Sequence, residues 1–161
     1  MFTNFKSFAV IVAAAAALAG VQAQESHTVT FNNQCKKGTP TLVQGGKILS
    51  TGQPYKSNGP LVSAIAYLQT GPCGLNGESC TLIETTLQNP TTPGSGSSSD
   101  ISLIVPHTFS VTSGFQYNNG CTGKADCNNA NCPEAFHQPN DTTVQVACQA
   151  PNAGLVINFC A

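Results

Sequence analysis

Residues 81–105 read TLIETTLQNPTTPGSGSSSDISLIV, and this stretch contains the pattern that decides the fold. The segment 81–87 is rich in β-branched residues, which favour extended strands. The segment 101–105 is apolar apart from Ser102, a composition typical of a strand that is buried on both faces. Between them, residues 90–99 are rich in Ser, Gly, Thr and Pro, and this composition predicts a flexible loop that buries little. The stretch therefore predicts two strands joined by a loop.

The same alternation of short strands and turns continues along the rest of the chain. The segment at Pro133–Phe136 favours a helical turn, because proline suits the first helical position. Strand patterns separated by Gly, Pro and Asn turns recur at 27–31, 42–43, 48–49, 61–69, 109–115, 143–147 and 155–159. So many short strands in 161 residues indicate an all-β sandwich or barrel in a single domain.

Composition and charge exclude some classes of function. With Lys+Arg 6 against Asp+Glu 7, the formal net charge is -1, which excludes a basic protein that binds nucleic acid by neutralising phosphates. Eight cysteines in so short a chain fit an oxidising compartment and permit disulfides throughout. The sequence contains no C-x-x-C pair, so a zinc site is not expected, and no other metal or cofactor is predicted.

The first 23 residues have the pattern of a secretory signal peptide. Lys6 precedes an apolar run at 8–18. Small residues follow at Val21 and Ala23, the two positions that a signal peptidase recognises. The run is too short to cross about 30 Å of hydrocarbon, so no membrane insertion is expected. We therefore predict that residues 24–161 form a secreted, extracellular and monomeric domain.

One sequon for N-glycosylation is usable. It is Asn140-Asp141-Thr142, because the proline in Asn89-Pro90-Thr91 excludes that second match. The domain is accordingly predicted to be a glycoprotein that carries a glycan at Asn140.

Several motifs, in order along the chain, resemble those of thaumatin-like proteins. The strand T-L-I-E-T-T-L at 81–87 is similar to the family's T-L-A-E-F-T-L, and D-I-S-L-I at 100–104 is similar to its D-I-S-L-V. The opening F-N-N-Q-C at 31–35 resembles F-x-N-N-C. The closing segment 132–161 has the C-P-x-A-aromatic start and the final F-C of the family pattern.

The resemblance is to a small form of that family. Only four residues separate Cys127 from Cys132, where large members insert a whole disulfide-rich domain, domain II. The resemblance implies a thaumatin-like, jelly-roll-like β-sandwich stapled by disulfides, whereas counting cysteines alone leaves their pairing open. The implied pairs are Cys35–Cys160, Cys73–Cys80, Cys121–Cys148 and Cys127–Cys132.

The resemblance also implies an acidic face. Glu84 and Asp100 fall on the glutamate and the first aspartate of the family's acidic cluster, and Asp141 lies in the segment that holds its third aspartate. In large members this cluster comprises one arginine, one glutamate and three aspartates, and it is linked with binding and sometimes hydrolysing β-1,3-glucan. Here Val105 replaces the second aspartate and the chain has no arginine, so His107 is the candidate replacement for part of the lost positive charge.

The positions of these residues also have explanations that involve no binding or catalysis. Alternation within its strand is compatible with a Glu84 that points to water, and Asp100 is compatible with the end of the serine-rich loop. Asp141 is also part of the glycosylation sequon. We expect His27 and His137 to be solvated on the surface. Five aromatic residues are candidates for stacking on sugar rings, with filling of the core as the alternative: Tyr55, Tyr67, Phe115, Tyr117 and Phe136.

We expect a secreted thaumatin-like protein that binds wall or extracellular carbohydrate, similar to β-1,3-glucan, through the face with Glu84, Asp100 and Asp141. Its role would be in defence, as an antifungal protein, or in the wall. A first alternative is binding of a secreted protein, as an enzyme inhibitor or antimicrobial effector, through the loops at 74–79 and 120–131. A second is a weak endo-β-1,3-glucanase using Glu84 and Asp100. Because the acidic cluster is incomplete, no catalytic residue is assigned.

Overall fold

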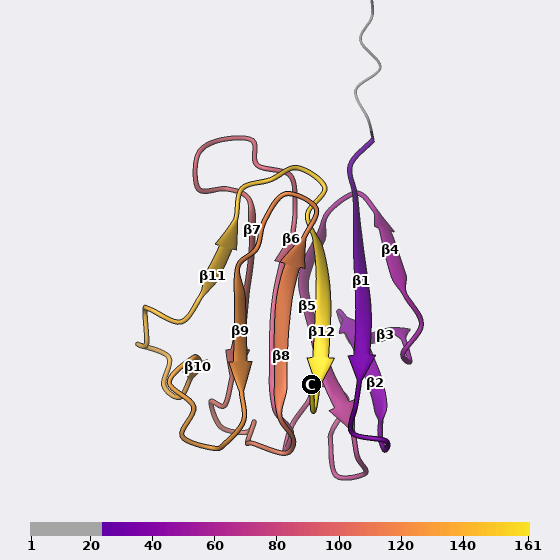
Figure 1. Ribbon diagram of the computed structural model, residues 1–161, viewed down its shortest axis with the longest axis vertical. Helices are drawn as coiled ribbons and strands as arrows, with labels where there is room; N and C mark the ends of the chain where they lie inside the picture. The colour runs from indigo at the N-terminus through magenta and orange to yellow at the C-terminus, as the bar shows by residue number, and fades with distance from the viewer. Residues whose placement is uncertain (1–23) are drawn as a thin grey trace, which may run out of the picture.

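The computed structural model describes residues 24–161, which form two β-sheets facing each other (Figure 1). No α-helix occurs in this range, so the predicted all-β sandwich is confirmed. Among the described residues there is also no helix of the length and apolarity that a membrane crossing requires. The predicted signal peptide at 1–23 lies outside the described residues.

The first sheet brings the two ends of the domain together. Its strand order is β4-β1-β12-β8-β9, and β1 and β12 run parallel, with Asn33 opposite Phe159 (Figure 1). The strands are β1 (Ser26–Asn33), β4 (Tyr55–Asn58), β8 (Ser113–Asn118), β9 (Lys124–Cys127) and β12 (Gly154–Phe159).

The second sheet contains both strands of the segment 81–105. The main order is β10-β7-β6-β5-β2-β3, and β11 also pairs with β7, so the two short strands β10 and β11 cover different parts of β7. The strands are β2 (Thr39–Gln44), β3 (Lys47–Ser50), β5 (Leu61–Gln69), β6 (Leu82–Leu87), β7 (Ser97–Ser102), β10 (Ala135–Phe136) and β11 (Val146–Cys148).

The main core lies between the two sheets. Successive side chains of a strand point to opposite faces, so every second residue of β5, β6 and β12 reaches this core. Its members from these strands include Ala64, Ala66, Leu68, Ile83, Leu87, Leu155 and Ile157.

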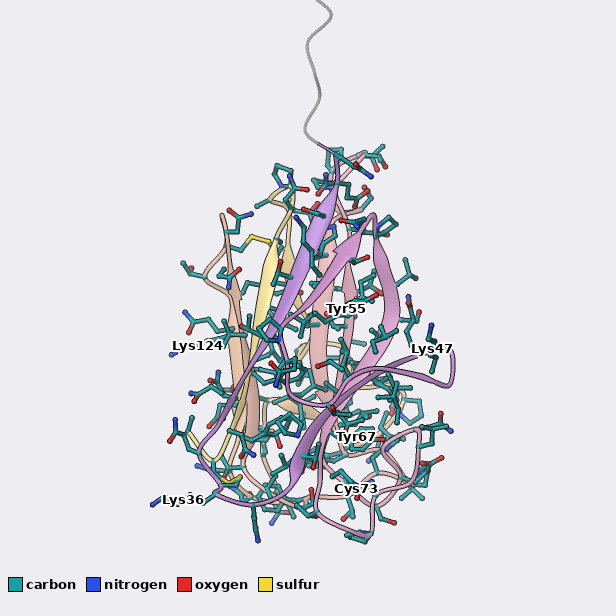
Figure 2. The ribbon with its side chains drawn as sticks, turned by 90° about the vertical axis from the view of Figure 1, so that its right-hand side faces the viewer. Lys36, Lys47, Tyr55, Tyr67, Cys73 and Lys124 are labelled. Atoms are coloured by element: carbon teal, nitrogen blue, oxygen red, sulfur yellow. A yellow bond between two sulfur atoms is a disulfide. The ribbon has the colours of Figure 1, made fainter. Side chains whose placement is uncertain are left out.

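A smaller apolar cluster covers part of the outer face of the seven-stranded sheet. Val43, Tyr67 and Leu82 pack there beneath the loop closed by the Cys73–Cys80 disulfide (Figure 2). The Tyr67 hydroxyl donates to the carbonyl oxygen of Leu75 at 3.0 Å. The loop is therefore held onto the sheet by packing, by a hydrogen bond and by the disulfide.

All eight cysteines lie in the described range and are paired. The pairs are the four that the resemblance implies: Cys35–Cys160, Cys73–Cys80, Cys121–Cys148 and Cys127–Cys132. The first of them joins residues 125 positions apart and ties the end of β1 to the end of the chain. On the chain-entropy model, closing a loop of that length stabilises the fold by about 5 kcal/mol.

The predicted helical turn at Pro133–Phe136 is wrong. Ala135 and Phe136 instead form β10, which pairs with Ile101 and Ser102 of β7. A neighbouring strand that offers free backbone groups competes with a helix of one turn, and the local preference of proline does not decide the outcome.

The serine-rich segment is also more ordered than its composition predicts. Ser97–Ser99 belong to β7, and the Ser99 hydroxyl is buried because it bonds to the hydroxyls of Thr85 at 2.7 Å and Tyr117 at 2.8 Å. Just before the strand, the side-chain oxygen of Gln149 accepts from the backbone N–H of Gly96 at 3.2 Å. Buried serines are tolerated here because their hydroxyls are satisfied.

Two further sequence predictions are wrong. The strand predicted at 101–105 ends at Ser102, and Val105, next to the cis Val105–Pro106 bond, is 88% exposed. His27 is 0% exposed instead of solvated. Its ring nitrogens lie 2.8 Å from the carbonyl oxygen of Ala153 and 3.0 Å from the carboxylate of Glu25. Ala153 is 126 positions away in the sequence, so the local pattern does not show this partner.

Candidate functional site

Glu84 and Asp100 stand directly opposite each other on adjacent antiparallel strands, β6 and β7. In such a pair the β-carbons lie about 4.5–5.5 Å apart. Their sequence neighbours Ile83 and Ile101 belong to the core between the sheets, so alternation directs both carboxyl groups to the outer face of the seven-stranded sheet. The sheet register therefore brings together two of the three acidic candidates.

The pair lies in a concave groove of about 220 Å³ on that outer face. The groove crosses β5, β6 and β7 and reaches the residue just before β11. Its lining residues are Ser63, Ala64, Ile65, Glu84, Thr85, Thr86, Ser98, Asp100 and Gln145. Hydroxyl and amide groups thus surround the two carboxyls.

A β-bulge shapes one wall of the groove. The pairing of β5 with β6 shifts between Leu61 and Ala64, and Ser63 there has a φ of 52°. Its backbone N–H donates to the Thr86 hydroxyl at 3.0 Å. Bulges of this kind bend a strand and redirect its side chains, and this one places Ser63 at the groove.

Asp100 has the most unusual environment of the acidic residues in the groove. It is 7% exposed, and among the described residues its Oδ1 has no hydrogen-bond partner. Burial, followed by the charge of Glu84, raises the pKa of Asp100 from 3.8 to about 7, while the side-chain amide of Gln145 acts in the opposite direction. Asp100 therefore keeps its proton in mildly acidic solution, next to an exposed Glu84.

The strand that carries Asp100 is fixed from its inner side. The Tyr117 hydroxyl donates to the Ser99 hydroxyl at 2.8 Å and lies 3.2 Å from the carbonyl oxygen of Val146. Burial raises the pKa of Tyr117 to about 12, so this phenol keeps the proton that it donates. The network links β7, β8 and β11 behind the groove and holds Asp100 in place.

Asp141 does not join the pair. Its carboxylate accepts from the backbone N–H of His137 at 2.8 Å and of Gln138 at 3.0 Å, and these bonds lower its pKa. It lines a separate depression together with Asn140, whose exposed side chain is open to modification. The acidic face predicted from three residues is thus a groove with two of them.

His107 does not take the place of the missing arginine. Its Nδ1 lies 3.0 Å from the carbonyl oxygen of Gly77, in the disulfide loop, and it is not among the described residues that line the groove. The residue that does contact Asp100 is Gln145, which was not among the candidates predicted from the sequence. Its alternation with Val144 and Val146 was the available signal, because it sets a polar side chain apart from two apolar ones.

Most of the aromatic candidates fill the interior. Tyr67, Phe115 and Tyr117 are fully buried, so for these three the alternative of core filling holds and stacking on sugar rings does not. In the part of the chain that the structure describes, no aromatic side chain lines the groove. Over residues 24–161 there is likewise no group of three or more His, Cys, Asp or Glu side chains that could hold a metal ion.

Comparison with known proteins gives one informative similarity. No family model matches the chain. The chain is similar to the "Thaumatin-like pathogenesis-related protein 2" of Avena sativa, with 36% identity over 88 residues. The match covers 55% of this chain and 46% of that protein, so it spans about half the length of the relative. This similarity, the two-sheet fold and the disulfides all support a relationship to thaumatin-like proteins.

Proposed function

We propose that this chain is a secreted member of the thaumatin-like proteins that binds cell-wall or extracellular carbohydrate through the groove at Glu84 and Asp100. The first candidate ligand is a polymer similar to β-1,3-glucan, and the role is in defence or in the wall. The observation that carries the proposal is the direct pairing of the two carboxyls within a concave, polar groove.

The chemistry of the groove suits a sugar. Each sugar hydroxyl both donates and accepts hydrogen bonds, and the groove offers the hydroxyls of Ser63, Thr86 and Ser98 together with two carboxyls. The Asp100 carboxyl also has a buried oxygen without a hydrogen-bond partner among the described residues, so its own hydrogen bonds are incompletely satisfied.

Secretion and a role in defence are supported by two different observations. The four disulfides, one of which spans the whole domain, are typical of proteins that function in oxidising surroundings. The name of the similar Avena sativa protein describes that relative as pathogenesis-related. Together they support a defence protein that acts outside the cell.

A pull-down on insoluble β-1,3-glucan tests the proposed site. The wild type should be retained, and Glu84→Gln and Asp100→Asn should each lose most of that retention. Asp126→Asn is the matched control, because Asp126 is an exposed carboxylate of the other sheet and should be retained like the wild type. Equal retention of all four proteins would remove the groove as the binding site.

Hydrolysis of the bound polymer is a second candidate function, favoured by the raised pKa of Asp100. A glycosidase needs one protonated and one ionised carboxyl, and the spacing for retention is about 5–5.5 Å. Asp100, whose pKa is about 7, would be the proton donor, and Glu84 would be the nucleophile. Release of reducing sugar from laminarin between about pH 4 and 7, lost in Glu84→Gln, would support hydrolysis. Binding without any release would leave a binding protein.

A further inference from the structure

The groove contains two acidic groups and no positive charge to balance them. Among the described residues that line it, none is a lysine or a histidine, and the chain contains no arginine. Lys36, Lys47 and Lys124 lie at the periphery of the molecule (Figure 2). An ionised Glu84 and an ionised Asp100 would therefore face each other at close range without compensation.

The burial of Asp100 adds a second and independent observation. The residue is more than nine-tenths buried, lines the groove, and has a carboxyl oxygen with no partner in the described part of the chain. The Gln145 amide offsets only part of the cost of ionising this buried carboxyl, and binding of a cation nearby removes more of that cost. The groove is therefore prepared for a ligand that contributes hydrogen-bond donors and a positive charge.

We propose that the groove selects an amino sugar, such as a glucosamine unit of a partly deacetylated chitin, whose ammonium group lies against Glu84 and Asp100. This inference rests on the proposed carbohydrate binding and names the class of sugar. The hydroxyls of Ser63, Thr86 and Ser98 are placed to bind the sugar hydroxyls around that ammonium group.

A sugar fits the groove better than a bare metal ion. Two carboxyls without a third acidic or imidazole ligand fall short of the six or more oxygen ligands that Ca²⁺ prefers. The volume of 220 Å³ corresponds to about seven water molecules, which is room for one sugar unit. The neutral hydroxyl and amide lining would then contact the ring.

Binding of an ammonium group has a measurable consequence for protons. Glu84 from β6 and the neutral amide of Gln145 face Asp100 in the groove, and the Tyr117 phenol from β8 lies on the opposite side of β7. A cation in the groove favours the charged form of Asp100, so binding releases the proton that this carboxyl holds in mildly acidic solution. A neutral sugar makes no such change.

The test is calorimetric titration at about pH 5.5 in two buffers that differ in their heat of protonation. The probes are the tetramers of glucosamine, N-acetylglucosamine and β-1,3-linked glucose. We expect the glucosamine tetramer to bind about tenfold or more tightly than the other two, since a hydrogen bond to a charged group contributes about 1.5–3 kcal/mol. Only that tetramer should release a proton on binding.

Variants distinguish specific binding in the groove from unspecific attraction between a negatively charged protein and a cation. Asp100→Asn should abolish the proton release, and Glu84→Gln, a change at an exposed side chain that leaves the fold intact, should remove the preference for glucosamine. Asp126→Asn removes one negative charge elsewhere and should retain both effects. If Asp126→Asn and Glu84→Gln weaken binding equally, the attraction is unspecific and the inference is overturned.

The remaining outcomes distinguish this inference from the function on which it rests. Equal affinity for all three tetramers, lost in Glu84→Gln, would overturn the selection of an amino sugar and leave carbohydrate binding in place. No measurable binding of any tetramer, together with no retention on insoluble glucan, would overturn both.

Discussion

Replacement of Asp100 by asparagine should make the protein more stable at neutral pH. The pKa of Asp100 is raised from 3.8 to about 7, so between these values the folded protein holds a proton that the unfolded chain has lost. The free energy of unfolding of the wild type therefore falls as pH rises from about 4 to 7. Asparagine cannot ionise, and its variant escapes this decline.

The size of the effect follows from the same pKa. A rise from 3.8 to about 7 corresponds to roughly 4 kcal/mol, since each tenfold change in the ionisation constant is worth about 1.4 kcal/mol. Because Glu84 is exposed and its charge is screened by solvent, the measured gain of Asp100→Asn at pH 8 should be about 2 kcal/mol. Near pH 4 the two proteins should differ by less than about 1 kcal/mol.

Urea denaturation of both proteins at intervals from pH 4 to 8 measures this difference. Glu84→Gln should give a smaller gain of the same sign, because it removes the second cause of the raised pKa. Asp141→Asn is a control that should lower the free energy of unfolding at neutral pH instead of raising it. The reason is that backbone N–H donors lower the pKa of Asp141. A gain of Asp100→Asn that is the same at every pH, or a loss at pH 8, would refute the reasoning.

Three further predictions concern features outside the groove. Replacing Cys35 and Cys160 by serine should lower the free energy of unfolding by about 5 kcal/mol in denaturant titrations, and an unchanged midpoint would contradict the long-range staple. Glu25→Gln should cost about 0.5–1 kcal/mol at pH 6. Hydrogen bonds from His27 and a backbone N–H lower the pKa of Glu25, so this cost should shrink as pH falls through that lowered value. A cost that does not change with pH would show that packing is responsible. Asn140→Gln should abolish the mass that a glycosidase for N-glycans removes from protein made in a secretory host, and an identical mass loss from the variant would place the glycan elsewhere.

The sequence predicted the parts of the site that depend on local pattern. Glu84 lies within a β-branched strand and Asp100 at the start of an apolar one, so their placement on neighbouring strands followed from the segment between them. Whether they share a face depends on register, because a slip of one residue would reverse every side chain. The resemblance supplied the pairing of cysteines for the same reason, since the pairing is a long-range property.

What the sequence did not show depends on contacts between distant segments. Gln145 reaches Asp100 because β11 pairs with β7, and β11 is only three residues long. Ser99 is buried because a threonine and a tyrosine from other strands satisfy its hydroxyl. His27 is buried because the loop before β12 offers it a carbonyl oxygen. In each case a polar residue expected at the surface finds its partner through the tertiary fold.

The claim that a sugar binds between β6 and β7 is tested most directly by an NMR titration of the backbone amides with the glucosamine tetramer and, separately, with the β-1,3-linked glucose tetramer. The account predicts that the largest shifts fall at Ser63, Glu84, Asp100 and Gln145, which three adjacent strands and a loop bring together at the groove. Shifts confined to the five-stranded sheet, or no shifts with either sugar at millimolar concentration, would contradict it.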